Sequence, residues 1–419
     1  MLGGDYVYLK QTFKEINNNW FMNSIIIIQM IVVFACTMCA TSIASYFYNY
    51  YSNFSDYYKQ KGDIYRFETV IYDSIAIESS DVLENELSKT DIISMYMPWA
   101  VYYNLQGDEL QYITFAYDKE IIDAFRPKLK EGRWINPNRT DGIIEAVILD
   151  SDYDLSVGMR IDMCDVYMLQ PNNGLTVEIV GIIEDGTRIV GISSSGNGQL
   201  YDYRNIYMDY YIEKEELPVI LTSIDSINVA MDMEDNHSLQ RSMSGLMFAA
   251  YENDITDSEI AANERVLGSV VRNYSKISMA TINENSIKSI KERLYSVLPV
   301  FLCVFMLVLI TGMCNFAISV KKHMRDYTIF SVCGMPWNKS AYICVIKATL
   351  MCLIAFVVSI VGIWIMLKKD IIKDTTIELG FLPVVSCVIV GGLYILLSSI
   401  MPFALINGTS LNSELKSNI

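Results

Sequence analysis

Side chains that could perform catalysis are scarce in this chain of 419 residues. It contains two histidines, His237 and His323, and no Cys/His spacing resembles a zinc or iron–sulfur site. No Gly-x-x-x-x-Gly-Lys-Ser/Thr run that could cradle nucleotide phosphates is present, and neither is a serine elbow or a kinase motif. We therefore expect a chain that is not an enzyme, holds no cofactor or metal, and relies on another polypeptide for any nucleotide chemistry.

Four apolar runs without a charged residue dominate the chain instead, and each reaches the ~20 residues that a helix needs to cross a bilayer. They are Ser24–Phe47, Leu294–Val320, Ala348–Leu367 and Phe381–Ile406. About 245 residues of ordinary soluble composition separate the first run from the second. The sequence therefore predicts an α-helical membrane protein with four transmembrane helices and a large α+β extracytoplasmic domain between helices 1 and 2.

The predicted organisation divides the chain into nine segments. They are a cytoplasmic amphipathic helix (1–23), transmembrane helix 1 (24–48), an extracytoplasmic domain with a stalk (49–293), transmembrane helix 2 (294–320), a cytoplasmic coupling-helix loop (321–340), transmembrane helix 3 (341–367), a short external loop (368–380), transmembrane helix 4 (381–406) and a cytoplasmic tail (407–419). In the first segment, Leu9, Phe13, Ile16 and Trp20 share one helical face. A plain extension of the first crossing is the alternative.

The distribution of charge predicts the orientation in the membrane. Short-loop lysines and arginines are more numerous in the termini and in 321–340 than in 368–380, which favours a cytoplasmic location for the former. Residues 49–293 carry 21 Lys/Arg and 41 Asp/Glu, a net charge of −20 within a total of −16. Such an acidic domain repels nucleic acid and favours cationic partners, although it could simply be a solvated surface. Lys347, near the start of the third crossing, is expected to snorkel to the inner interface.

The loop between the second and third runs holds the best candidate site. Ile329, Phe330 and Cys333 would lie on one face of a short helix, with Arg325 and Asp326 toward its start. Gly334 followed by Pro336 is typical of a helix end. A short amphipathic helix with a free apolar face suits a groove on a partner, and the alternative is a helix lying on the bilayer.

The same run, RDYTIFSVCGM from Arg325 to Met335, resembles the motif of FtsX-like permeases, roughly R-E-I-G-I-L-R-A-L-G. Asp326 replaces the usual Glu, and Cys333 replaces an aliphatic residue. The resemblance implies that this element is the coupling helix, which docks on an ABC ATPase subunit that binds ATP and magnesium. The ATPase-coupling residues would then be Arg325, Asp326, Ile329, Phe330, Cys333 and Gly334.

The segment 49–293 is predicted to mix helices and strands. Strands are expected at Asp63–Tyr72, Ala100–Leu105, Tyr112–Ala116, Ala146–Leu149, Met159–Met163 and Leu175–Ile183. Helices are expected at Ser80–Ser88, at Asp257–Ser275 and, as a stalk, at Asn283–Leu294, and a loop at Gly191–Gln199. Gly132 and Gly158 suit turns, and Gly181 suits a bulge.

Four short motifs of this segment, KEGRW at Lys130, EAVIL at Glu145, VGMRI at Val157 and VEIVGII at Val177, follow one another in a familiar order. They resemble the periplasmic core domain of MacB-type ABC transporter permeases. The resemblance implies a permease in the bacterial plasma membrane with both termini cytoplasmic. It also implies a second permease as partner, in a homodimer or a paralogous heterodimer, and mechanotransmission rather than a path through the bilayer.

Export of, or resistance to, a peptide or lipid-like compound is the expected function, and the acidic domain mildly favours a cationic peptide. Lipoprotein extraction and cell-wall hydrolase regulation are alternatives within the same class of permease. A ligand sensor that signals through 321–340, or a membrane scaffold, are alternatives outside it. The other partners expected are membrane lipids, and no nucleic acid.

Overall fold

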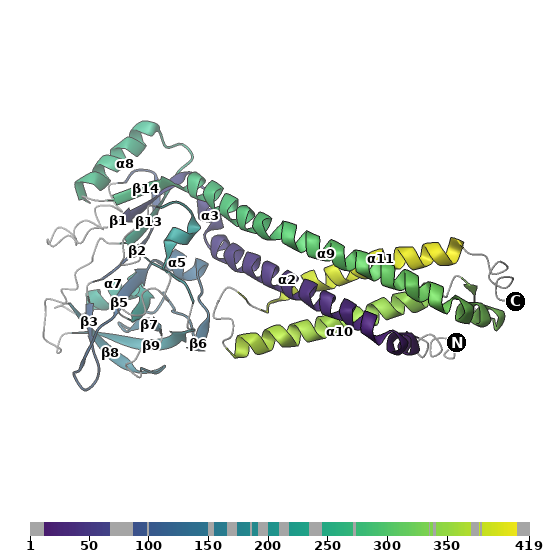
Figure 1. Ribbon diagram of the computed structural model, residues 1–419. Coiled ribbons are helices and arrows are strands. Elements are labelled where there is room, and N and C mark those ends of the chain that lie inside the picture. The colour runs from purple at the N-terminus through teal and green to yellow at the C-terminus, as the bar shows by residue number, and fades with distance from the viewer. Residues whose placement is uncertain are drawn as a thin grey trace. The chain divides into compact units, whose positions relative to one another are not determined.

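The computed structural model describes residues 12–67, 87–98, 100–149, 155–165, 174–184, 187–191, 200–208, 218–233, 245–270, 274–334, 336–337, 341–369, 377 and 379–408. The chain divides into two compact units. The helical unit comprises Met1–Phe47 and Ile290–Ile419, and the sheet unit comprises Tyr48–Ser289. Figure 1 labels most of the elements of both units.

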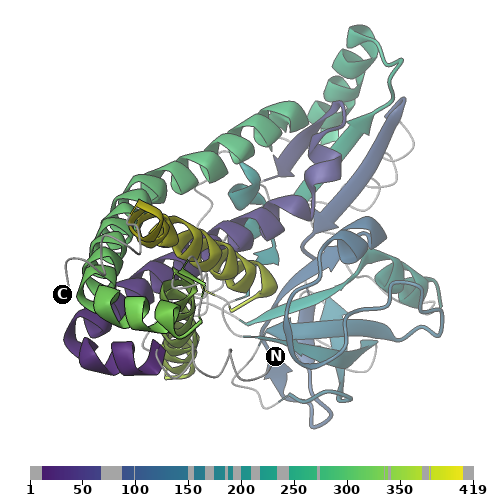
Figure 2. The ribbon, with the colours of Figure 1, turned by 90° about the vertical axis from the view of Figure 1, so that its right-hand side faces the viewer.

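Four long helices build the helical unit: α2 (Trp20–Ser52), α9 (Met279–Val332), α10 (Ala341–Lys368) and α11 (Phe381–Gly408). All four are long and apolar enough to cross a membrane. They pack around a core that includes Phe34 of α2, Phe305 of α9, Met351 of α10 and Tyr394 of α11. Figure 2 shows these helices from one end of the unit. Many large apolar side chains stay exposed on the outer faces of α9, α10 and α11, as expected for helices surrounded by lipid.

Strands of the sheet unit join into one twelve-stranded sheet within the described residues. The order is β14-β1-β13-β2-β5-β12-β7-β9-β8-β3-β4, with β6 paired to β9. The bounds are β1 Gly62–Phe67, β2 Thr90–Tyr96, β3 Ala100–Tyr103, β4 Glu109–Leu110, β5 Ile113–Tyr117, β6 Leu129–Gly132, β7 Ile144–Leu149, β8 Arg160–Asp165, β9 Leu175–Ile183, β12 Val219–Ser223, β13 Gly245–Tyr251 and β14 Tyr274–Ser278. The pairs β12–β5 and β7–β9 are parallel, and the other pairs are antiparallel.

Short helices and one further strand pair complete this unit. They are α3 (Ser55–Tyr58), α5 (Lys119–Ala124), α7 (Ile224–Met233), α8 (Asp257–Val270), the 3₁₀ helix η2 (Tyr203–Ile206), β10 (Ile189–Val190) and β11 (Tyr207–Met208). Helix α7 packs on β7 and β12, and α5 packs on β2 and β5. Buried aliphatic residues from the central strands, among them Ile148, Ile179 and Ile220, form the larger core of the sheet.

The expected turn and bulge glycines have the required backbone. Gly132 and Gly158 have φ values of +83° and +89°, a region that favours glycine. The pairing of β7 with β9 shifts register between Ala146 and Val147, opposite Ile179 and Gly181, so a bulge lies at the predicted place. A side chain at position 181 would collide with the carbonyl oxygen of Arg133, 2.5 Å from its Cβ.

Most predicted strands correspond to observed ones, and Leu175–Ile183 matches β9 in full. The prediction of a helix over Asp257–Ser275 is wrong at its end, because Tyr274–Ser278 form β14 and pair with β1. There, the hydrogen bonds of these residues with the distant strand β1 outweigh the local sequence pattern that predicts a helix. The predicted helix at Ser80–Ser88 and the loop at Gly191–Gln199 lie largely outside the described residues.

The expected separate short helix in 321–340 differs from the structure. Helix α9 runs without a break from Met279 through the predicted stalk to Val332, where Cys333 and Gly334 turn the chain. Nothing between Val320 and Val332 is a strong helix breaker, so the helix continues until Gly334, whose φ is +103°. The candidate coupling residues therefore occupy the last turns of a 54-residue helix and the turn after it.

Candidate functional site

The coupling residues predicted from sequence form an exposed strip at the C-terminal end of α9. Arg325 and Cys333 are exposed, half of Ile329 remains accessible to solvent, and Asp326 is half-buried. Arg325, Ile329 and Val332 follow one another at spacings of four and three, so they share one helical face. Phe330 lies in the same helix, but its side chain is outside the described part of the structure. This strip combines charged and apolar side chains.

Buried polar side chains support the strip from the opposite face of α9. Tyr327 is fully buried, and its hydroxyl donates to Glu15 Oε1 at 3.0 Å. Ser319 Oγ lies 3.5 Å from Glu15 Oε2, and Lys347 Nζ of α10 lies 3.4 Å from Ser319 Oγ. Glu15, Ser319, Tyr327 and Lys347, which we call the inner polar cluster, are each at most 1% exposed. They join the N-terminal segment to α9 and α10 at the end that carries the predicted coupling residues.

The inner polar cluster corrects one expectation. Lys347 does not snorkel to an interface: it is 0% exposed, contacts Ser319, and its Nζ lies 5.8 Å from the centre of the Phe316 ring. A buried ammonium needs polar neighbours, and Ser319 and the nearby carboxylate of Glu15 provide them. Glu15 could have been noticed in the sequence as the only acidic residue of 12–23, but its partners lie more than 300 residues away.

Residues 12–23 make two further contacts with α9. Lys322 Nζ donates to Asn19 Oδ1 at 2.9 Å, and Asn315 Nδ2 donates to Asn23 Oδ1 at 3.3 Å. Residues 12–18 are helical, as predicted, and Phe13 and Trp20 remain more than half exposed. Glu15, Asn19 and Asn23 of this segment therefore contact α9, and Phe13 and Trp20 stay free to lie in a membrane interface.

A second group of hydrogen bonds lies in the sheet unit and holds the start of α9. Tyr51, at the end of α2, donates its hydroxyl to Asn283 Oδ1 at 2.5 Å. The backbone N–H of Tyr203 donates to Ser286 Oγ at 3.0 Å, and Asn285 Nδ2 donates to the carbonyl of Tyr201 at 2.9 Å. We call these six residues, together with Tyr50, Asn53 and Tyr207, the stalk joint.

The same joint also holds the end of α2. Tyr207 donates its hydroxyl to the carbonyl of Tyr50 at 2.8 Å and accepts a hydrogen bond from Asn53 Nδ2 at 3.2 Å. The rings of Tyr50 and Tyr207 meet edge to face, with centroids 4.9 Å apart. Burial raises the pKa of Tyr207 well above its ordinary value of 10, so the hydroxyl stays protonated and able to donate. Both helices that leave the sheet unit are thus bound to the 201–207 segment.

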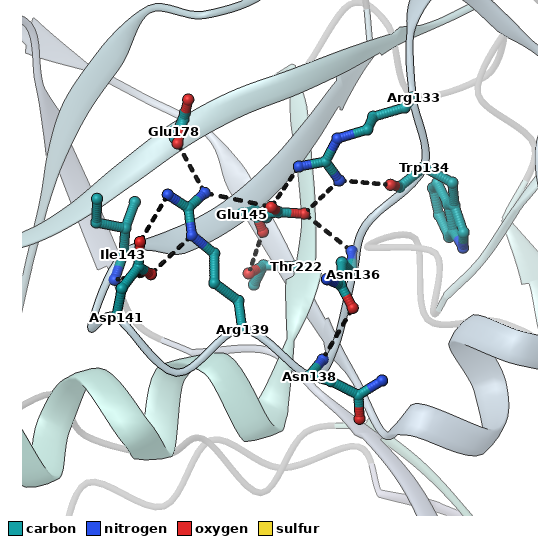
Figure 3. A network of polar contacts seen from close by, with 10 residues as sticks. All are labelled: Arg133, Trp134, Asn136, Asn138, Arg139, Asp141, Ile143, Glu145, Glu178 and Thr222. Carbon is teal, nitrogen blue, oxygen red and sulfur yellow. Dashed lines mark hydrogen bonds and ion pairs between the residues drawn. The ribbon is translucent and has the colours of Figure 1, made fainter.

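Arg133 and Trp134 of the KEGRW motif belong to a network of polar contacts within the sheet unit (Figure 3). Glu145 on β7 is 2% exposed as a side chain, and Arg133 binds it through both guanidinium nitrogens. Arg139 bridges Glu145 at 3.2 Å and Glu178 at 2.7 Å, and also pairs with Asp141. Burial raises the pKa of Glu145, but the hydrogen bonds from Arg133 and the N–H of Asn136 outweigh it and leave the pKa below its usual value.

This network closes the loop between β6 and β7 onto the sheet. Each carboxylate in it has a cationic partner, and Arg139 is shared among three of them. No group of three or more His, Cys, Asp or Glu side chains that could hold a metal occurs among the described residues.

Comparison with known proteins found similarity to solved structures. No protein-family model matches the sequence, and no curated protein matches it either. The periplasmic region of MacB from Actinobacillus actinomycetemcomitans is similar over 54% of this chain and 92% of that one, with 10% identity and a TM-score of 0.29. The extracellular domain of the noncanonic ABC-type transporter YknZ from Gram-positive bacteria is similar over 52% of this chain and 99% of that one, with 8% identity and a TM-score of 0.28.

Sequence reasoning predicted the coupling residues, which stay a prediction, and missed the inner polar cluster and the stalk joint. The residues of the strip lie within about ten positions of one another, so their helical spacing can be read directly from the sequence. The partners in the joint come from positions near 51, 203 and 283, which are far apart in the sequence. A high density of tyrosine between residues 46 and 58 is the signal that could have drawn attention to the joint.

Proposed function

We propose that this chain is the permease subunit of an ATP-driven ABC transporter of the MacB/FtsX-like class, working by mechanotransmission. A separate ABC ATPase would dock on the exposed strip at the end of α9. A second permease, identical or paralogous, would complete the transporter. The chain itself would perform no chemistry and would carry force from the ATPase to the sheet unit.

The observation that carries this proposal is the continuity of α9. One helix bears the stalk joint near its first turns and the exposed strip in its last turns. From Asn283 to Ile329 it provides about 70 Å of helix at 1.5 Å per residue. The helix lacks one backbone hydrogen bond at Pro299, and the remaining bonds resist changes in length, so a displacement at one end would be transmitted to the other.

The architecture around α9 supports the same function. Outside the inner polar cluster, the described residues of the four helices bury no Asp, Glu, Lys or Arg side chain, and their buried polar residues are Ser, Thr, Asn and His. The described bundle therefore shows no charged path for a substrate. A protein that moves its substrate outside the bilayer needs no such path. A peptide or lipid-like compound is the proposed substrate, and the net charge of −20 over residues 49–293 favours a cationic peptide.

Docking on the strip can be tested by introducing a charge at its apolar centre. Ile329→Glu should reduce the amount of ATPase that co-purifies with this chain by tenfold or more. It should also abolish the change in ATPase rate that this chain causes. The matched control is Ile318→Ala, another exposed isoleucine of α9 that lies three turns earlier and outside the strip. Unchanged ATPase coupling in Ile329→Glu, or purification from native membranes without any ATPase, would contradict the proposal.

A further inference from the structure

A cavity of about 310 Å³ lies within the helical unit among α2, α9 and α11. Its size falls at the lower end of the range of ligand-binding pockets. Ala40, Ala44 and Phe47 of α2 line one side, and Leu298 of α9 and Ile389 of α11 line the others. The small side chains of α2 leave the space that the cavity occupies.

The hydroxyl groups in the cavity wall are already used within their own helices. Thr37 Oγ1 donates to the carbonyl of Val33 at 2.7 Å, and Thr41 Oγ1 donates to the carbonyl of Thr37 at 2.7 Å. Ser386 Oγ donates to the carbonyl of Leu382 at 2.9 Å. The wall therefore presents methyl and methylene groups, and a polar occupant would lose its hydration there without gaining hydrogen bonds.

Arg293 of α9 is the one charged residue that lines the cavity. Its guanidinium carbon lies 4.2 Å from the centre of the Phe47 ring, and the side chain is exposed. Among the described residues, Arg293 forms no ion pair. A guanidinium whose donors are free for a phosphate or carboxylate thus stands beside a space that fits hydrocarbon.

We propose that this cavity binds an acyl chain of an anionic membrane phospholipid, whose phosphate pairs with Arg293. The apolar wall takes the chain. The guanidinium selects an anionic head group over a zwitterionic one. This lipid site does not depend on the proposed transport function, because it follows from the cavity and its single cation alone.

Native mass spectrometry of the full-length protein tests the site. Phosphatidylglycerol and phosphatidylcholine with identical chains would be added separately, and the fraction of protein that retains one lipid would be measured. We expect the wild-type protein to retain phosphatidylglycerol about threefold to tenfold more than phosphatidylcholine. Arg293→Gln should abolish this preference, whereas Arg293→Lys should keep most of it.

The matched control is Lys291→Gln, which removes an exposed cation two residues away that does not line the cavity. A preference that survives Arg293→Gln, or that Lys291→Gln abolishes equally, would overturn the proposal and indicate general attraction of anionic lipid to the surface. Ile389→Trp provides a second readout, because a tryptophan in the cavity wall reports a bound acyl chain directly and does not depend on a variant that loses binding. Its fluorescence should be quenched more by phosphatidylglycerol with brominated chains than by the equivalent phosphatidylcholine, and equal quenching would also overturn the proposal.

Discussion

Two tyrosines near the stalk joint differ in how their hydroxyl groups are satisfied. The hydroxyl of Tyr51 bonds to Asn283 at 2.5 Å, whereas that of Tyr58, which is 0% exposed, has no hydrogen-bond partner among the described residues. The two rings pack together, with centroids 5.8 Å apart. Removal of one oxygen atom at each position therefore separates the hydrogen bond from the aromatic packing.

Tyr51→Phe is expected to lower the free energy of unfolding by about 1 kcal/mol, because Asn283 loses its buried partner. Tyr58→Phe should be neutral or stabilising, because it removes a buried hydroxyl that gains nothing from burial. Chemical denaturation of the full-length protein measures both changes. Equal destabilisation by the two substitutions would argue against the described role of the Tyr51 hydroxyl.

Asp118 gives the sheet unit a dependence on pH. Burial raises its pKa from 3.8 to about 7, although hydrogen bonds from the N–H and hydroxyl of Ser94 lower it. The folded state therefore holds the proton more tightly than the unfolded state. The stabilising effect of this group is complete below pH 4 and is lost as the pH rises to 7.

Asp118→Asn should accordingly make the free energy of unfolding depend less on pH between pH 4 and 7. The change in free energy that it removes over this range is on the order of 4 kcal/mol at most. The asparagine oxygen can still accept from Ser94. Thermal unfolding followed across this pH range provides the measurement, and Asp123→Asn, an exposed acid of α5, is the control. If the stability of the wild-type protein did not fall between pH 4 and 7 relative to that of Asp118→Asn, the raised pKa of Asp118 would be refuted.

At the scale of elements, glycines determine how closely the spanning helices approach. A Cβ at Gly312 of α9 would lie 2.5 Å from the hydroxyl of Tyr394 on α11, and Tyr394 is fully buried. A Cβ at Gly392, also in α11, would meet no atom within 4 Å. Close approach of backbones through small residues is a general means of helix association in membranes.

Gly312→Ala should therefore destabilise the helical unit by about 1–3 kcal/mol, since a packed core has no room for the displaced tyrosine. Gly392→Ala should stabilise α11 slightly, because alanine favours helix more than glycine does. Thermal melting of the detergent-solubilised protein distinguishes them. If both variants melted at the same temperature, the contact between Gly312 and Tyr394 would not determine helix packing.

At the scale of the whole molecule, the proposed mechanism requires the two ends of α9 to face opposite sides of the membrane. The exposed strip must meet a cytoplasmic ATPase, and the sheet unit must meet an external substrate. The excess of lysine and arginine in the termini and in 321–340 predicts this arrangement.

Single-cysteine labelling of intact cells tests the arrangement. In a background without other cysteines, Leu105→Cys, at a position 85% exposed in the sheet unit, should react with a membrane-impermeant maleimide. The native Cys333, exposed beside the strip, should react only after the cells are opened. Labelling of Cys333 in intact cells, with protection of Leu105→Cys, would reverse the orientation and remove the basis of the mechanism.

The sequence by itself determined the features that depend on neighbouring residues. The four apolar runs, the glycine that ends α9, the turn and bulge glycines and strand β9 follow from hydropathy and backbone preference within about ten to thirty residues. Only the tertiary structure decided which distant residues meet. It placed Glu15 beside Tyr327 and Tyr51 beside Asn283, turned Tyr274–Ser278 into a strand, and buried Lys347. These outcomes depend on packing between segments far apart in the chain, which local pattern does not encode.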